Sequence, residues 1–129
     1  MATTLELASL VVSDYDEAID WYTKALGFSL LEDSPQGDGK RWVVIGPTSG
    51  GGAKLVLAKA ANVQQFDAIG KAAGGRVAFF LHTDTFDLQY QNMLTLGVHF
   101  REKPRNEPYG KVAVFDDLFG NGWDLIGPA

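Results

Sequence analysis

The sequence predicts an α+β fold of two tandem βαβββ modules, because one order of strand, helix and three further strands occurs twice along the chain. The length of 129 residues fits a single domain, residues 1–129, that is built from two small modules. The 15 glycines indicate many tight turns, which are typical of a strand-rich fold. A hydrophobic fraction of 46% is ordinary for a folded chain and excludes extensive disorder.

The first module spans residues 1–58. It opens with a leucine-rich and β-branched stretch, residues 5–12, which predicts a strand. Asp14 is then placed to cap a helix that ends at Gly27, since glycine adopts the left-handed backbone of a helix end without strain. The turn-rich segments 34–39 and 47–52 separate three further predicted strands, at residues 28–31, 41–45 and 53–58.

The second module spans residues 76–129 and repeats this order. A predicted strand at residues 76–83 leads to Asp84, which we expect to cap a helix that ends at Gly97. Apolar residues at helical spacing support this helix. Three more strands are expected at residues 98–101, 111–115 and 123–126.

Residues 59–75 connect the two modules and allow two interpretations. In the first, Asn62 caps a short helix that Gly74 and Gly75 end. In the second, the segment is a plain linker.

The charge balance and the missing cysteines narrow the class of partner. Eleven basic and 16 acidic residues give a net charge of −5, which disfavours phosphate backbones and anionic membrane surfaces and suits a neutral or cationic small molecule. With no cysteine, the chain has no disulfide and no thiolate metal site. The first residues show no signal peptide and no membrane span, so we expect a cytoplasmic protein that binds neither nucleic acid nor membrane.

Particular phrases within this repeat resemble the vicinal oxygen chelate superfamily. They are Val12-Ser13-Asp14, Ala18-Ile19-Asp20-Trp21-Tyr22 and Leu26-Gly27-Phe28, and near the end Tyr109-Gly110, Ala113-Val114-Phe115-Asp116-Asp117, Gly120-Asn121 and Trp123-Asp124-Leu125. The superfamily includes glyoxalase I, bleomycin-resistance proteins and extradiol dioxygenases. The resemblance implies a curled mixed sheet around a central cavity, and homodimers are common among such folds. It leaves the reaction open, because one fold supports several chemistries.

The resemblance also implies where a metal would be held, namely at one position on each of four strands. On this sequence those positions fall on Leu7, Val56, a residue between Arg76 and Ala78, and Asp124. Only Asp124 offers the oxygen donor that a divalent ion needs. A register slip of one residue would instead bring Glu6 to the first position. Without the slip, the sequence resembles the metal-free, bleomycin-resistance-like branch, and we expect no metal and no cofactor.

Two residues are candidate catalytic groups for the alternative of a lyase or dioxygenase-type enzyme. Strand alternation places His82 on the face of Phe80, where it is either a general acid or base or a hydrogen-bonded histidine at a strand end. Asp124 faces away from its two apolar neighbours. It is either a polar anchor for a ligand amine or hydroxyl or part of an ion pair with Arg76 or Lys54.

Metal-free binding or sequestration of a small organic molecule is the function that the sequence favours. The loop at residues 104–110 is rich in polar and aromatic groups and is stiffened by two prolines, so it is either a ligand-gripping loop or a rigid hairpin with a surface Arg105–Glu107 pair. We expect a homodimer whose ligand contacts are Ser9, Trp42, Phe80, Arg105, Glu107 and Tyr109. Alternation puts Trp42 and Val44 on one strand face without showing which face is inside.

Overall fold

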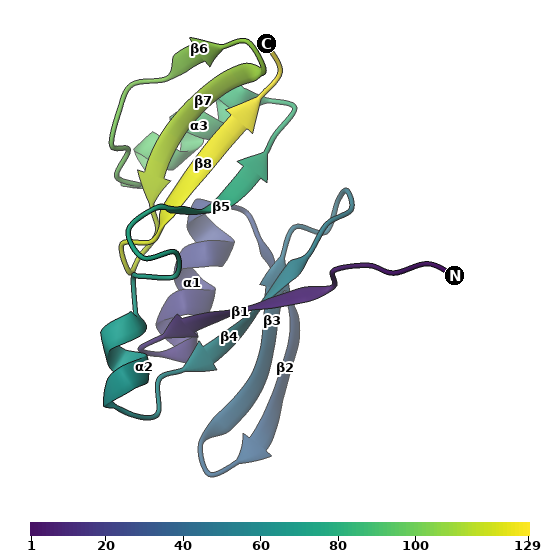
Figure 1. Ribbon diagram of the computed structural model, residues 1–129, viewed down its shortest axis with the longest axis vertical. Coiled ribbons are helices and arrows are strands. Elements are labelled where there is room, and N and C mark those ends of the chain that lie inside the picture. Colours follow the sequence, from purple (N-terminus) through teal and green to yellow (C-terminus); the bar gives the residue numbers. More distant parts are fainter. The chain divides into compact units, whose positions relative to one another are not determined.

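A computed structural model describes residues 1–129 as two compact units, Met1–Ile69 and Gly70–Ala129 (Figure 1). Each unit contains one βαβββ module, so the predicted α+β fold with tandem modules is confirmed. No helix is long and apolar enough to cross a membrane.

The first unit contains a four-stranded mixed sheet with the order β1-β4-β3-β2. The strands β1 and β4 pair in parallel, and the other neighbours are antiparallel. The elements are, in chain order, β1 (Leu7–Val12), α1 (Tyr15–Ala25), β2 (Ser29–Gly37), β3 (Lys40–Gly46), β4 (Lys54–Lys59) and α2 (Val63–Ala68).

The second unit repeats this topology, with the strand order β5-β8-β7-β6 and a parallel pair between β5 and β8. Its elements are β5 (Val77–His82), α3 (Phe86–Thr95), β6 (Arg105–Glu107), β7 (Gly110–Asp116) and β8 (Gly122–Gly127). In both modules, therefore, the first strand lies beside the last one.

The helices α1 and α3 each pack on one face of the sheet of their own unit. The helix α1 buries Tyr15, Ala18, Tyr22 and Ala25, and the apolar strand residues Leu10, Val43, Ile45 and Leu57 are buried with them. In the second unit, Phe86 and Met93 of α3 are buried together with Phe115, Trp123 and Leu125. The Trp123 ring lies 4.7 Å from the Phe79 ring and 5.9 Å from the Phe115 ring. These apolar contacts supply most of the stability of each unit.

Of the two N-caps predicted for the long helices, the structure contains one. The Asp14 carboxylate accepts a hydrogen bond from the Glu17 amide at 2.8 Å, which confirms it as the N-cap of α1. The expectation for Asp84 is wrong. The connection from β5 to α3 is one residue longer than that from β1 to α1, so Thr85 takes the N-cap position and the Thr83 hydroxyl accepts from the Thr85 amide. Gly27 and Gly97 have the expected left-handed backbone.

The connecting segment between the modules contains the short helix rather than a plain linker. The Asn62 side chain accepts from the Gln65 amide at 2.9 Å, so the predicted cap is confirmed. The predicted end at Gly74 and Gly75 is wrong, because α2 stops at Ala68. None of its residues is buried, so no packing extends this helix further.

Two strand boundaries also differ from the prediction. The strand β2 continues through Pro35 to Gly37, since β2 lies at the sheet edge, where a missing N–H is tolerated. Residues 98–101 do not form a strand and make only the isolated bridge between Phe100 and Phe115. The amide of Val114 bonds to the Glu102 side chain at 3.1 Å, so it is not available to a neighbouring strand.

We predict that Asp14→Ala lowers the free energy of unfolding by about 1 kcal/mol, because the Glu17 amide loses its partner. Urea unfolding monitored by circular dichroism measures the change. Asp84→Ala is the matched control and should change stability by less than about 0.5 kcal/mol, since Asp84 is exposed and makes no cap bond. Equal losses in both variants would contradict this assignment of the caps.

Candidate functional site

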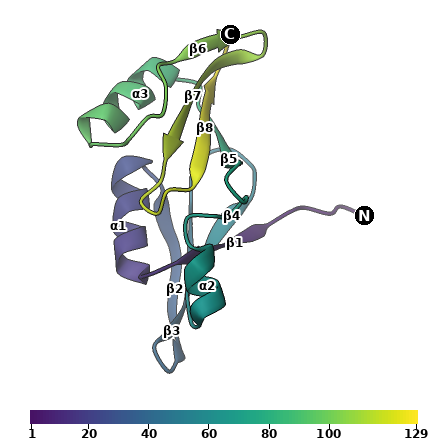
Figure 2. The same ribbon diagram turned by 60° about the vertical axis from the view of Figure 1, so that its left-hand side comes forward.

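In the second unit, α3 lies on one side of the sheet (Figure 2). The strand register places most of the candidate residues on the opposite face. In one row, Phe80 pairs with Asp124 and Asp124 pairs with Val114. In the next row, His82 pairs with Ile126, Ile126 with Val112, and Val112 with Arg105. Because directly paired residues and residues two apart share a face, all these side chains lie on one side. We call this side the helix-free face: Phe80, His82, Arg105, Glu107, Val112, Val114, Asp124 and Ile126.

Asp124 is a partly buried carboxyl group on this face. Its Oδ1 atom is buried and accepts no hydrogen bond. Burial raises the pKa of Asp124 above its ordinary value, the positive charge of Arg105 opposes this rise, and the negative charge of Glu102 adds to it. The alternative of an ion pair with Arg76, which belongs to the same unit, is wrong, because Arg76 is exposed and makes no ion pair. Lys54 belongs to the first unit, where its ammonium donates to the Pro47 carbonyl at 2.7 Å.

Arg105 lies between two carboxylates next to Asp124. Its Nε atom is 3.3 Å from Glu107 Oε1, and its Nη1 atom is 3.5 Å from Glu102 Oε2. The predicted Arg105–Glu107 pair is therefore present, although residues 105–107 form the strand β6 and not a loop. Together Glu102, Arg105, Glu107 and Asp124 form a polar cluster with three carboxyl groups and one guanidinium.

His82 and Tyr109 line a shallow pocket of about 360 Å³ at one end of the helix-free face. The His82 side chain is exposed at the end of β5. Tyr109 is 62% exposed in the turn between β6 and β7. The remaining lining residues are Thr83, Asp84, Ile126, Gly127 and Pro128.

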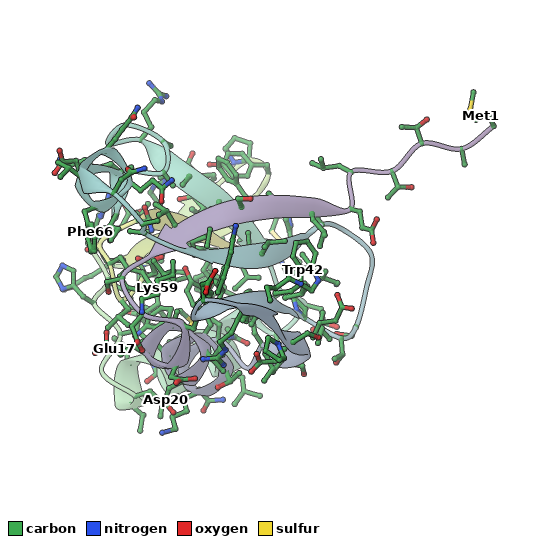
Figure 3. The ribbon with its side chains drawn as sticks, turned by 90° about the horizontal axis from the view of Figure 1, so that it is seen from below. Met1, Glu17, Asp20, Trp42, Lys59 and Phe66 are labelled. Carbon is green, nitrogen blue, oxygen red and sulfur yellow. The ribbon has the colours of Figure 1, made fainter.

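The first sheet likewise has a face turned away from its helix, and this face carries the other two predicted contacts. Ser9 pairs with Val56, which pairs with Val44, and Trp42 lies two residues from Val44 on the same side. The position of Trp42, which the sequence left undecided, is thus on the helix-free side of the first sheet. Its indole Nε1 donates to Glu32 Oε2 at 3.0 Å. Figure 3 shows Trp42 extending from the strands and Asp20 on the side of α1 that is turned away from the sheet.

The neighbouring Arg41 fastens the strand that carries Trp42. Its guanidinium donates to both Asp33 oxygens, at 3.0 and 2.7 Å, and to Asp16 on α1 at 3.0 Å. These bonds hold the pKa of Asp33 below its ordinary value. The Arg41 amide also donates to the Tyr15 hydroxyl at 3.1 Å, which ties β3 to α1.

The residues at the four metal positions that the resemblance implies do not fit a divalent ion. Leu7, Val56, Val77 and Ala78 have no ligating atom, Arg76 is a cation without a lone pair to give, and Asp124 is the single carboxylate. Leu7 pairs with Lys54 in an unshifted register, and Glu6 precedes the strand, so the alternative of a register slip is wrong. No group of three or more His, Cys, Asp or Glu side chains is arranged so that it could hold a metal ion.

Glu102 belongs to the polar cluster but was not among the residues predicted from the sequence. It lies three positions before Arg105, and that spacing of opposite charges was the only signal. Its place was not predictable because it depends on the bond to the Val114 amide, a tertiary contact between residues 12 positions apart in the sequence.

The fold and its two helix-free faces define a protein of the class that the resemblance implied. Residues 4–125 match the Glyoxalase/Bleomycin resistance protein/Dioxygenase superfamily, and the chain belongs to this family.

Individual relatives support this assignment along the whole chain. An uncharacterized protein from Shewanella frigidimarina (strain NCIMB 400) is 50% identical over 119 residues, which cover 92% of this chain and 88% of the relative. The crystal structure of UcmS2 has a TM-score of 0.83 and 30% identity and covers 98% of both chains. TnmS3, an antibiotic binding protein from Streptomyces sp. CB03234, has a TM-score of 0.76 and 30% identity and covers 100% of this chain and 98% of TnmS3.

We predict a pH-dependent effect of Asp124→Asn on stability. Because the folded state raises the pKa of Asp124, the stabilisation from its neutral form is fully present below the ordinary value of 3.8 and is lost as pH rises through the folded-state pKa. Relative to the parent, Asp124→Asn should therefore gain stability between about pH 3 and pH 7. Urea unfolding at a series of pH values measures this difference.

The matched control for this series is Asp67→Asn, since Asp67 is exposed on α2 and makes no ion pair. It should show no such gain with pH. A stability difference between Asp124→Asn and the parent that is flat with pH, or that shrinks as pH rises, would contradict the burial of an ionisable Asp124.

Proposed function

We propose that the protein binds and sequesters a small organic molecule, and that binding needs no metal ion. One observation carries this proposal: the helix-free face of the second sheet combines an exposed aromatic residue, Phe80, with a polar cluster in which a buried Asp124 oxygen accepts no hydrogen bond. Binding sites for small molecules typically join apolar surface to a few placed polar groups. The antibiotic-binding activity stated for TnmS3, which this chain resembles along its whole length, supports the same function.

Apolar contact supplies affinity in this proposal. Phe80 is 61% exposed and Tyr109 is 62% exposed, so a ligand ring that covers them removes apolar surface from water. Trp42 and Ser9 on the first sheet are further proposed contacts. Sequestration then requires no reacting group, because binding lowers the concentration of the free molecule by mass action.

Arg105, Glu107 and Asp124 orient the ligand in this proposal. A hydrogen bond from a ligand to a charged side chain contributes more binding free energy than one to a neutral side chain. The polar cluster therefore selects among molecules that have similar apolar surface. With three carboxyl groups to one guanidinium, the cluster disfavours an anionic ligand.

The second candidate function is a lyase or dioxygenase-type reaction that uses His82 and Asp124. It is supported by the register, which places both side chains on one face of the adjacent strands β5 and β8. Imidazole and a carboxyl group of raised pKa are the pair that general acid–base chemistry uses. An activity that His82→Ala abolishes, while binding of the same molecule persists, would favour this candidate over sequestration.

A homodimer in the cytoplasm is also part of the proposal. Large apolar side chains remain exposed on two helices, and self-association would cover such surface: Val63 and Phe66 on α2, and Leu88 and Leu94 on α3. Light scattering at several concentrations tests it, and a constant monomer mass would contradict the dimer.

The function is tested by calorimetric titration with a panel of aromatic antibiotics and other amphipathic compounds of different charge. We expect saturable binding of at least one compound, unchanged by excess EDTA. Phe80→Ala should weaken that binding by about tenfold or more, since an aromatic contact of about 1.5–3 kcal/mol is lost. Leu88→Ala, which removes a similarly exposed side chain on α3, is the matched control and should leave binding unchanged. Binding that EDTA abolishes, or no binding by any compound, would contradict the proposal.

A further inference from the structure

On the helix-free face, two buried polar atoms, one hydrogen-bond acceptor and one donor, have no hydrogen-bond partner. One is the acceptor Oδ1 of Asp124, and the other is the donor Nη1 of Arg105. Nη1 lies 3.5 Å from Glu102 Oε2, but this contact lacks the geometry of a hydrogen bond. Native proteins leave few buried polar groups without a partner, because each one weakens the folded state.

The fold brings these two atoms to the same part of the sheet. Glu102 Oε2 accepts from the Val114 amide at 3.1 Å and also faces Arg105 Nη1. Val114 is the direct cross-strand partner of Asp124. The guanidinium end of Arg105 is therefore held next to the residue that flanks the Asp124 carboxyl, and the charge of Arg105 acts on Asp124 without an ion pair between them.

The chemistry of the two atoms restricts the group that satisfies both. An ammonium donates to Asp124 but has no lone pair to accept from Arg105, so it leaves Nη1 without a partner. A carboxylate accepts from Arg105 but is repelled by Asp124. A hydroxyl or a primary amide both donates and accepts, so it can bridge the two side chains while remaining neutral. Phe80, the cross-strand partner of Asp124 on its other side, is 61% exposed and offers apolar surface beside this bridge.

We infer that Arg105 and Asp124 form a two-point anchor for a neutral hydroxyl or amide group of an aromatic ligand whose ring lies against Phe80. This inference rests on the proposed function and names the class of ligand that the site takes. The anchor discriminates against ligands that lack the hydroxyl or amide group, because such a ligand leaves both buried atoms without hydrogen-bond partners.

The test uses four small probes that share one ring, benzyl alcohol, benzamide, ethylbenzene and benzylammonium, titrated into the ¹⁵N-labelled full chain. Amide shifts in residues 122–126 and 105–107 report binding at the anchor. We expect benzyl alcohol and benzamide to bind about tenfold or more tightly than ethylbenzene, as a hydrogen bond to a charged group predicts, and more tightly than benzylammonium.

Two variants separate the anchor from a structural role. In Asp124→Leu and Arg105→Met, the preference for benzyl alcohol over ethylbenzene should fall at least fivefold, a ratio that a general loss of packing would not change. Asp87→Asn, an exposed carboxylate on α3, is the control and should retain the parental preference. The use of both variants keeps the test valid if one of them fails to fold.

Each remaining outcome decides the inference. Equal affinities for the alcohol and the hydrocarbon, a preference that survives both variants, or tightest binding of benzylammonium would contradict the anchor and leave the proposed function standing. No binding by any of the four probes would contradict the anchor, whereas the proposed function is contradicted only if the panel of antibiotics and amphipathic compounds also fails to bind.

Discussion

The parallel pairing of the first and last strand of each module determines which side chains share a face. Parallel neighbours need a crossover connection, and here the helix and the intervening hairpin supply it. The helix covers one face of the sheet, so the strand residues alternate between a packed side and a helix-free side. In the second unit this pairing brings Phe80, from the start of the module, beside Asp124, from its end.

Because of this alternation, a single strand contributes to the packed core with one face and to the proposed binding site with the other. Trp123 and Leu125 of β8 are buried with the core, whereas Asp124 between them points to the other side. The packed side can thus stay close-packed while the helix-free side carries charged groups. Asp124 is partly buried on this side, and its burial raises the pKa of its carboxyl group. The positive charge of the Arg105 guanidinium partly offsets this rise.

Features fixed by a few neighbouring residues were predictable from the sequence, and features fixed by distant contacts were not. The Asp14 cap and the glycines that end the helices depend only on local backbone, and the order of helix and strands along the chain followed from the repeat. The Asp84 prediction failed because the repeat has one extra residue in its second copy. Residues 98–101 look like a strand, yet Phe100 packs against the rings of Tyr90 and Phe115, at 4.7 and 5.6 Å, and the segment forms only one bridge. The charged neighbours of Asp124 depend on the β6–β7 register, which no local pattern reveals.

Metal-free binding is the central claim of the proposed function, and elemental analysis of untagged protein tests it most directly. The protein is incubated with nickel, zinc, manganese and iron(II), and free ions are then removed. Because neither Leu7 nor Val56 nor any of residues 76–78 offers a ligating atom, the expected result is far less than one bound metal ion per chain. Near-stoichiometric metal that disappears in Asp124→Ala would contradict metal-free binding and point to a metalloenzyme.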